Sequence, residues 1–294
     1  MKIVMTGATG YIGGKVLERL ADDGHQVYAV VRNASRLESI KDKVAGVVYS
    51  TPYLQLYEAF AKIQPDAYIN LAGSYAGKHT PEKIQGLFDG NVILPTYVTD
   101  AVVKAGCRKV IHTASYQQCY HGAPYSPVNL YAATKQSFED VLLYYAACEG
   151  VCAITLQLFD TYGADDTRRK VFNLVRMLQE GEHLGLSPGE QKLYFCYISD
   201  VVEAYITALE LLEKQEAGTY HRYAVRGESP VSLKEFAEKY CVLSGKRLFL
   251  DWGARDYMDR EIMDPTGYGE VLPGWHPNIS YEQGLMKCAK FDSL

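Results

Sequence analysis

A tyrosine followed four residues later by a lysine could transfer a proton to a carbonyl oxygen. On a helix the two side chains share one face. The lysine cation favours the phenolate and so lowers the pKa of a phenol that is otherwise near 10. The sequence contains two such pairs, Tyr131/Lys135 and Tyr11/Lys15. Because the chain has 24 tyrosines, roughly one or two pairs are expected by chance, so the elements around each pair must decide its role.

Apolar, β-branched segments alternate along the chain with segments of helical pattern. The apolar segments are nearly continuous rather than alternating, as expected of parallel strands covered on both faces. The order predicts an α/β fold with a Rossmann-type, doubly wound parallel sheet. The expected strands are residues 2–6, 26–31, 46–50, 66–72, 109–114 and 152–159, and the expected helices are 11–23, 53–63, 82–105 and 129–148.

The character of the sequence changes after about residue 160, where turn-rich segments such as GADDTRR, SPGEQ and LPGWHPN separate short elements. We expect residues 193–198 to return to the sheet domain, together with the following helix, which has Ser199 or Asp200 as its N-cap. The predicted division is a dinucleotide-binding domain and a smaller, interleaved C-terminal substrate-binding lobe. The first comprises residues 1–160 and 193–219, and the second residues 161–192 and 220–294.

The segment TGATGYIGG places Gly7, Gly10 and Gly13 directly after the first strand and at the start of the first helix. Gly7 permits the tight turn, Gly10 lets a pyrophosphate approach the backbone, and Gly13 lets the helix pack close to the strand. The helix N-terminus then offers unpaired N–H groups to the phosphates. The placement predicts a dinucleotide site, and it makes Tyr11 and Lys15 part of that turn, with Lys15 expected to point into solvent.

The end of the second expected strand indicates which dinucleotide binds. An NAD site usually has Asp or Glu there, to accept hydrogen bonds from the ribose 2′-hydroxyl. Here the segment reads VVRNASR, with Arg32, Asn33 and Arg36 and no carboxylate. A cation suits a 2′-phosphate through charge-assisted contacts, which predicts NADP(H). In the alternative interpretation, Arg32 stacks on the adenine or faces solvent.

Composition excludes several classes of function. The net charge of −5 leaves no basic patch for nucleic acid, and no apolar run is long enough to span a bilayer. The N-terminus reads as a strand and a Gly-rich turn rather than a signal peptide. The seven cysteines are scattered without a C-x-x-C or zinc spacing. We therefore expect a cytoplasmic protein with reduced cysteines, no metal, and no membrane or nucleic-acid partner.

Several segments, in this order, resemble the extended short-chain dehydrogenase/reductases. They are TGATGYIG, the NLAG of residues 70–73, Ser115 after KVIHTA, and Tyr131-x-x-x-Lys135. That family comprises nucleotide-sugar epimerases, dehydratases and reductases. The segments SPVNLYAATKQSFED, LQLFDTYGADDTR, SPGEQ and LPGW are most similar to the CDP-abequose/CDP-paratose synthase branch. The similarity covers nearly the whole chain and is strongest over residues 1–200.

The resemblance implies roles for individual residues. Tyr131 is the expected proton donor and Lys135 its partner and a contact of the nicotinamide ribose. Ser115 orients the substrate oxygen, with Thr113 as the competing hydroxyl. The expected cofactor-binding residues are Gly7, Thr9, Gly10, Tyr11, Ile12, Gly13, Arg32, Asn33, Arg36, Leu71, Ala72, Gly73, Tyr131, Lys135 and Phe159. The expected substrate-binding residues are Ser115, Tyr116, Gln117, Asp160, Lys170, Lys192, Arg255 and Arg260.

Departures from the family pattern narrow the reaction. Dehydratases carry an acidic pair after the active-site hydroxyl, where this chain has Tyr116 and Gln117. Epimerases retain and recycle NAD, which disagrees with an NADP-type strand end. Asp160 replaces the Asn that many members place beside the sugar diphosphate. Arg255, Arg260, Lys170 or Lys192 are therefore the alternative diphosphate partners.

These departures lead to a single hypothesis, with two alternatives left open. The hypothesis is NADPH-dependent reduction of the C4 ketone of a nucleotide-activated 4-keto-6-deoxy or 3,6-dideoxy sugar. We expect the sugar to be CDP-linked and to enter a surface polysaccharide such as the lipopolysaccharide O-antigen. The alternatives are an NAD-recycling nucleotide-sugar 4-epimerase and a non-enzymatic NADP-binding regulator on the same fold.

The resemblance also implies a homodimer, because family members commonly pair through the helices that correspond to residues 82–105 and 129–148. Apolar residues that could supply the interface are Val98, Ala101, Val102, Phe138, Val141, Leu142 and Tyr145. In the alternative interpretation, these side chains pack only on their own sheet.

Overall fold

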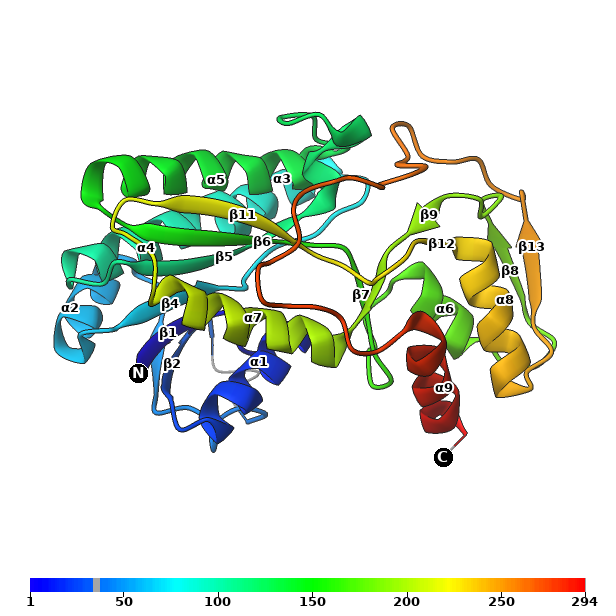
Figure 1. Cartoon of the computed structure of the whole chain (residues 1–294), viewed down its shortest axis with the longest axis horizontal. Helices are drawn as coiled ribbons and strands as arrows, with labels where there is room; N and C mark the ends of the chain where they lie inside the picture. Colours follow the sequence, from blue (N-terminus) through cyan, green and yellow to red (C-terminus); the bar gives the residue numbers. More distant parts are fainter. Residues whose placement is uncertain (34–37, 294) are drawn as a thin grey trace.

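The computed structural model describes residues 1–33 and 38–293 and is built around one parallel sheet (Figure 1). The sheet has seven strands in the order β11-β6-β5-β4-β1-β2-β3, and every pairing is parallel. The predicted doubly wound, Rossmann-type α/β class is therefore confirmed. Its strands are β1 (Lys2–Thr6), β2 (Gln26–Val31), β3 (Gly46–Tyr49), β4 (Ala67–Asn70), β5 (Lys109–Ser115), β6 (Cys152–Leu158) and β11 (Tyr220–Val225).

Helices cover both faces of this sheet (Figure 1). One face carries α1 (Tyr11–Asp22) and α7 (Ile198–Leu212). The other carries α2 (Leu54–Ile63), α3 (Pro81–Phe88), α4 (Leu94–Lys104) and α5 (Leu130–Glu149). Within the part of the chain that the structure describes, no helix is long and apolar enough to cross a membrane.

The helix expected over residues 82–105 is divided. A π-helical turn at Asp89–Ile93 separates α3 from α4, and Pro95 lies in the first turn of α4. A proline inside a continuous helix removes one backbone hydrogen bond and crowds the preceding turn, so the wider turn accommodates it.

Strand β11 corrects the predicted lobe boundary, which assigned residues from 220 onward to the second lobe. It pairs in parallel with β6 at the edge of the central sheet, with Ile154 opposite His221. Its sequence, YHRYAV, mixes His and Arg with apolar residues. Because of these polar residues, the segment lacks the nearly continuous apolar pattern by which the other sheet strands were predicted.

Residues 193–198, which were expected to belong to the sheet domain, do not add a strand to the central sheet. Strand β9 (Lys192–Leu193) pairs with β12 (Val231–Ser232), and β10 (Phe195–Tyr197) pairs with β7 (Asp160–Tyr162). Only the following helix, α7, packs on the central sheet. Its N-cap is Tyr197 rather than Ser199 or Asp200.

The second lobe contains α6, α8 and α9 and the short parallel pair β8–β13 (Figure 1). Aromatic rings fill its core: Phe236 stacks on Phe195 at 3.5 Å between ring centroids and meets Tyr162 edge-on at 5.2 Å. The bounds of these elements are α6 (Val171–Met177), β8 (His183–Leu186), α8 (Leu233–Ser244), β13 (Phe249–Trp252) and α9 (Tyr281–Asp292).

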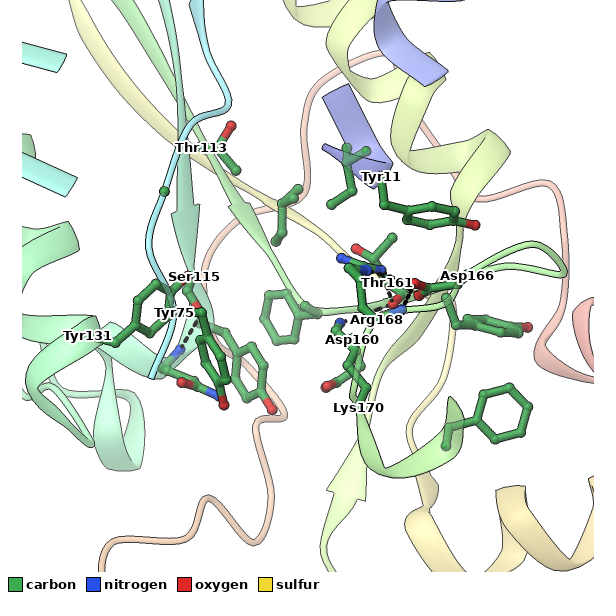
Figure 2. A pocket seen from close by; sticks show the side chains of 18 of the residues that line it. Tyr11, Tyr75, Thr113, Ser115, Tyr131, Asp160, Thr161, Asp166, Arg168 and Lys170 are labelled. Atoms are coloured by element: carbon green, nitrogen blue, oxygen red, sulfur yellow. Dashed lines mark hydrogen bonds and ion pairs between the residues drawn. The ribbon is translucent and has the colours of Figure 1, made fainter. Parts of the chain in front are cut away.

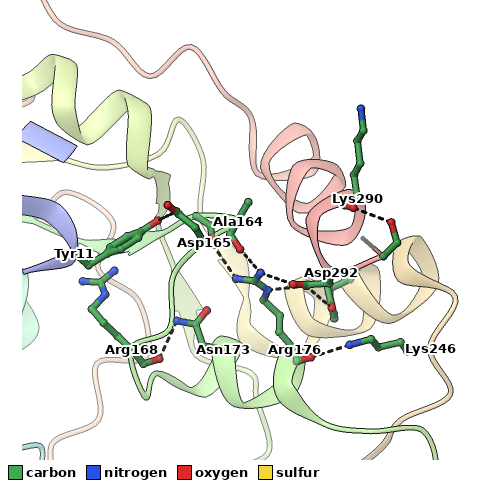
Figure 3. Close-up of polar contacts among 12 residues, drawn as sticks. Tyr11, Ala164, Asp165, Arg168, Asn173, Arg176, Lys246, Lys290 and Asp292 are labelled. Carbon is green, nitrogen blue, oxygen red and sulfur yellow. Dashed lines mark hydrogen bonds and ion pairs between the residues drawn. The ribbon is translucent and has the colours of Figure 1, made fainter. Parts of the chain in front are cut away.

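A buried arginine links the C-terminal helix to the loop after β7 (Figure 3). Arg176 forms two hydrogen bonds with Asp292, from Nε at 2.8 Å and from Nη2 at 2.7 Å. Its Nη1 donates to the carbonyl oxygen of Gly163 at 2.9 Å. Bidentate contacts of this kind fix geometry as well as charge, so α9 holds one end of the loop of residues 163–170 in place.

The side chains predicted to form a dimer interface are mostly buried within their own chain, which corrects that prediction. Val98, Ala101, Val102, Phe138 and Leu142 are at most 1% exposed, and Tyr145 is 7% exposed. They pack between helices α4 and α5 and the sheet, as the alternative interpretation expected. A dimer through these helices would use outward side chains instead, such as Phe88 and Tyr144.

Candidate active site

A cavity of about 660 Å³ lies where the carboxyl ends of β1, β4, β5 and β6 meet the second lobe (Figure 2). Open α/β sheets bind their ligands at this edge. The glycine-rich turn lines one part of the cavity, and residues that follow β4, β5 and β6 line other parts together with residues of the second lobe.

The glycine-rich turn has no space for side chains. A Cβ on Gly7, whose φ is +76°, would lie 2.5 Å from the backbone carbon of Leu71, and one on Gly13 would lie 2.1 Å from the Gly7 oxygen. The N-cap of α1 is Gly10, which provides no side-chain acceptor. The first N–H groups of α1 therefore lack intrahelical acceptors beside a cavity lined by Gly10, Tyr11 and Gly13. This arrangement fits the pyrophosphate of a dinucleotide.

The other predicted cofactor residues divide into two groups. Leu71, Gly73 and Phe159 line the cavity, as do Ile12 and the glycines. Thr9, Ala72, Arg32 and Asn33 are not among the lining residues, and Arg32 and Asn33 are exposed directly after β2. Arg36 lies outside the described residues.

Tyr131 and Lys135 lie one turn apart at the start of α5, and both line the cavity. The helix begins at Leu130 because the Asn129 side chain accepts a hydrogen bond from the Ala132 N–H at 2.9 Å, a standard N-cap contact. Tyr131 meets the exposed ring of Tyr75 edge-on, with 4.9 Å between centroids.

The electrostatics of the pair differ from the prediction that the lysine cation lowers the pKa of the phenol. Burial raises the pKa of Tyr131 to about 12, and a hydrogen bond with Ser115 opposes this rise. The Lys135 Nζ instead donates to the carbonyl oxygens of Thr113 at 3.1 Å and Ala72 at 3.4 Å. At neutral pH the phenol is therefore protonated and able to donate.

Lys135 is itself perturbed by its surroundings. Burial lowers its pKa to about 8, and the carboxylate of Glu139 opposes that change. An ammonium is disfavoured away from water unless countercharges or acceptors stabilise it. Near neutral pH, Lys135 is thus charged but close to its titration range.

Ser115 is the hydroxyl that the structure places beside Tyr131. It is the N-cap of the short 3-10 helix η3 (Tyr116–Gln118), and its Oγ accepts from the Gln117 N–H at 3.3 Å. The competing hydroxyl of Thr113 shares a 2.6 Å hydrogen bond with the buried Tyr205. Both residues line the cavity, and the choice of Ser115 over Thr113 stays a prediction.

The predicted substrate residues also divide. Tyr116, Gln117, Asp160 and Lys170 line the cavity together with Ser115. Lys192, Arg255 and Arg260 do not, which corrects their expected place at a diphosphate.

Local partners explain two of these corrections. Lys192 pairs with Asp264 at 3.0 Å. Arg260 donates to the Ser126 Oγ at 2.8 Å and lies 4.3 Å from the ring centroid of Tyr120. Arg255 is exposed, and its backbone N–H donates to the Leu186 carbonyl oxygen.

Asp160 lies in a mixed acidic and basic environment. Burial raises its pKa, whereas Lys170 and a hydrogen bond with Tyr116 lower it. Glu261, which the sequence gave no reason to choose, also lines the cavity, and its pKa is raised by burial and by Asp160. Burial and Arg168 in turn lower the pKa of Lys170 to about 8.

The lining residues that were absent from the predicted set include Tyr75, Arg168, Arg169 and Glu261. Two signals in the sequence were available. Tyr75 closely follows the NLAG segment, and Arg168 and Arg169 adjoin Lys170 in one basic run. Figure 2 shows Arg168 and Lys170 on one side of the cavity and Ser115, Tyr75 and Tyr131 on the other.

The second Tyr/Lys pair has a different role from the one predicted for it. Lys15 does not simply point into solvent: its Nζ lies 2.7 Å from Asp165. The Tyr11 hydroxyl donates to the same carboxylate at 3.0 Å (Figure 3), and the Arg168 guanidinium lies 4.6 Å from the Tyr11 ring centroid. The pair therefore ties the loop of residues 163–170 to the glycine-rich helix.

Comparison with known proteins agrees with this geometry. Residues 3–224 match the NAD dependent epimerase/dehydratase family. The chain is 28% identical to the CDP-abequose synthase of Salmonella typhimurium, over 98% of this chain and 97% of that protein. It is 25% identical to the UDP-glucose 4-epimerase of Mycolicibacterium smegmatis, over 99% and 98%.

The fold is shared with solved structures over the full chain. The UDP-glucuronic acid 4-epimerase from Bacillus cereus, in complex with UDP-glucuronic acid and NAD, superposes with a TM-score of 0.85 at 19% sequence identity. The match covers 100% of this chain and 99% of that one. Both lobes therefore have counterparts in that structure.

Proposed function

The chain belongs to the NAD dependent epimerase/dehydratase family, and from this premise we propose that it is an NADPH-dependent nucleotide-sugar 4-ketoreductase. Its substrate would be a 4-keto-6-deoxy or 3,6-dideoxy sugar, CDP-linked as in the 28% identical CDP-abequose synthases. The observation that carries the proposal is that Tyr131 and Ser115 line one cavity with the glycine-rich turn. Burial raises the pKa of Tyr131 to about 12, which favours the protonated phenol at neutral pH.

The chemistry assigned to the protein is proton donation and orientation. When bound, the reduced dinucleotide supplies the hydride for C4. Tyr131 donates its proton to the C4 oxygen, and the Ser115 hydroxyl holds that oxygen by a hydrogen bond. Lys135 lies one helical turn from Tyr131 on α5, and its buried ammonium adds positive charge to this part of the cavity.

The diphosphate and the sugar are assigned to different parts of the cavity. Arg168, Arg169 and Lys170 line one side. The Arg168 guanidinium is paired with Asp166, and Arg169 and Lys170 can bind a diphosphate through charge-assisted hydrogen bonds. Asp160 and Glu261 are acceptors for sugar hydroxyl groups and repel phosphate when ionised. Lys192, Arg255 and Arg260 do not line the cavity and have no part in this assignment.

The residues after Ser115 argue against dehydration. Removing water across C5 and C6 requires an acid and a base of its own, whereas Tyr116 and Gln117 follow Ser115. An amide cannot exchange a proton in this way. The Tyr116 hydroxyl has its pKa raised well above the usual value by burial and by Asp160.

An NAD-recycling 4-epimerase is the second candidate function, because UDP-sugar 4-epimerases match this chain over nearly its whole length. A non-enzymatic NADP-binding regulator is the third, and the presence of Tyr131, Lys135 and Ser115 in one cavity speaks against it. The reductase and the epimerase differ in whether the cofactor is consumed during the reaction.

The proposal is tested by measuring NADPH oxidation with CDP-, dTDP-, GDP- and UDP-linked 4-keto sugars. We expect one NADPH consumed for each sugar reduced, with NMR of the product showing a new C4 hydroxyl. Purified protein that carries tightly bound NAD and interconverts C4 epimers without net oxidation would establish the epimerase instead.

Arg32→Asp is expected to lower the NADPH-to-NADH preference in kcat/KM by about ten- to a hundredfold, because a charge-assisted phosphate contact is lost and a repulsion added. Steady-state kinetics with both cofactors measure the change. Lys104→Asp, which makes the same charge change at the exposed end of α4, is the control. An unchanged preference in Arg32→Asp would remove the argument for NADP(H).

The roles of the two lobes, the oligomeric state and the cellular location are also proposals. We place cofactor binding in the lobe built on the central sheet and nucleotide-sugar binding in the smaller lobe. We further propose a cytoplasmic homodimer that supplies a deoxysugar for a surface polysaccharide. Light scattering at low protein concentration tests the dimer.

A further inference from the structure

A buried amide connects the turn that carries Ser115 to helix α5. Gln118, the last residue of η3, is completely buried. Its Oε1 accepts from the Ser115 N–H at 2.8 Å, and its Nε2 donates to Glu139 Oε1 at 2.6 Å and to Gln136 Oε1 at 3.2 Å. Because both ends of the amide are bonded, its orientation is fixed. The Ser115 turn is therefore held against α5.

Glu139 is a carboxylate buried inside the protein, with 2% of its surface exposed. Its second oxygen accepts from the Tyr220 hydroxyl at 2.8 Å and lies 3.7 Å from Arg222 Nε. A buried ion pair costs desolvation energy, and apolar replacements are often no less stable. Packing alone therefore gives no reason for a charge at this position.

The position of Glu139 relative to Lys135 supplies such a reason. The two residues are four apart on α5, so they lie on the same face one turn apart. At this spacing the Glu139 carboxylate favours the charged form of Lys135 and raises its pKa against the effect of burial, while the closest cation to Glu139 among the described residues is Arg222. The other charged and titratable groups around them are Tyr220 and Arg222 on β11 and His112 on β5. Burial, Lys135 and Arg222 lower the pKa of His112, so it is neutral and supplies no countercharge.

We propose that Glu139 is a positioning residue of the active site, which holds the Ser115 turn through Gln118 and supplies the countercharge of the buried Lys135 ammonium. Neither Gln118 nor Glu139 lines the cavity, so neither touches substrate. The inference rests on the proposed roles of Ser115 and Lys135, and it does not depend on which sugar is reduced.

The first test follows Lys135 directly and needs no substrate. In protein labelled with ¹³C at lysine Cε, the Lys135 signal is assigned by its loss in Lys135→Met and then titrated. Glu139→Gln is expected to lower the apparent pKa of Lys135 by about one unit or more. Tyr145→Phe, which loses a 2.9 Å hydrogen bond from the same helix to Asp100, is expected to leave it unchanged. An unchanged titration in Glu139→Gln overturns the countercharge role.

The second test addresses the link to Ser115. Gln118→Met keeps the charge of Glu139 and is expected to lower kcat by about tenfold or more, with NADPH affinity retained and the Lys135 titration unchanged. Glu139→Gln is expected to move the alkaline limb of the pH–rate profile to lower pH, whereas Tyr145→Phe keeps the wild-type profile. Wild-type kcat in Gln118→Met overturns the link to Ser115.

Two other outcomes of these experiments can also be interpreted. If Glu139→Gln does not fold, Glu139→Asp takes its place, and partial recovery of both readouts is expected from the shorter carboxylate. If the wild-type protein reduces none of the sugars, the proposed function fails, while the Lys135 titration still decides the role of Glu139.

Discussion

Replacing Tyr131 with Phe is expected to lower kcat for ketone reduction by about 10²- to 10⁴-fold, the usual contribution of a general acid. The change removes one hydroxyl and keeps the ring that packs against Tyr75. Cofactor binding should persist, because the glycine-rich turn is untouched. NADPH oxidation at saturating substrate and NADPH fluorescence titration measure the two quantities separately.

Tyr11→Phe is the matched control, since Tyr11 is the tyrosine of the other Tyr-x-x-x-Lys pair. It loses a hydrogen bond to Asp165 on the far side of the glycine-rich turn from Ser115. Its kcat should change by no more than a few-fold, while its KM for NADPH can rise. If Tyr131→Phe kept more than a tenth of wild-type turnover, the assignment of the proton donor would be wrong.

Lys135→Met should lower kcat about 10²-fold and also abolish the alkaline limb of the pH–rate profile. Burial lowers the pKa of Lys135 to about 8, so the ammonium is present below that pH and is lost as pH rises through it. Wild-type activity should therefore fall above about pH 8. Tyr131, with a pKa of about 12, stays protonated throughout this range. Kinetics from pH 6 to 10 measure the limb.

Lys15→Met is the control for this prediction. Lys15 pairs with Asp165 and is partly exposed, and its pKa is raised by that hydrogen bond. Replacing Lys15 should leave the alkaline limb of the pH–rate profile in place. If Lys135→Met kept the alkaline limb of the wild-type pH–rate profile, another group would be responsible for that limb.

The loop of residues 163–170 connects the glycine-rich helix to the C-terminal helix and explains why the lobes form one site. Its Asp165 accepts from Tyr11 and pairs with Lys15 at the glycine-rich helix. Its other contacts run through Arg176 to Asp292 at the C-terminal helix. The basic side chains of this segment are held by near neighbours, such as Asp166 for Arg168, on a loop that is itself fixed by residues far away in the sequence.

Local patterns in the sequence determined the fold class and the positions of the cofactor turn and of the Tyr131/Lys135 pair. Gly7 adopts a positive φ in the turn, and Gly13 approaches the backbone oxygen of Gly7, a few residues earlier. The Asn129 cap and the four-residue spacing act within one or two helical turns. Such features depend on neighbours along the chain, so the sequence alone was sufficient to predict them.

Contacts between distant residues were decided only by the tertiary structure. The sequence could not show that Lys192 and Arg260 are occupied by Asp264 and Ser126, or that Arg168 and Glu261 enter the cavity. It also could not show that Gln118 joins Ser115 to Glu139, or that Lys135 donates to the Thr113 carbonyl oxygen. Each depends on where burial and the strand order place a side chain in space, which no local spacing records.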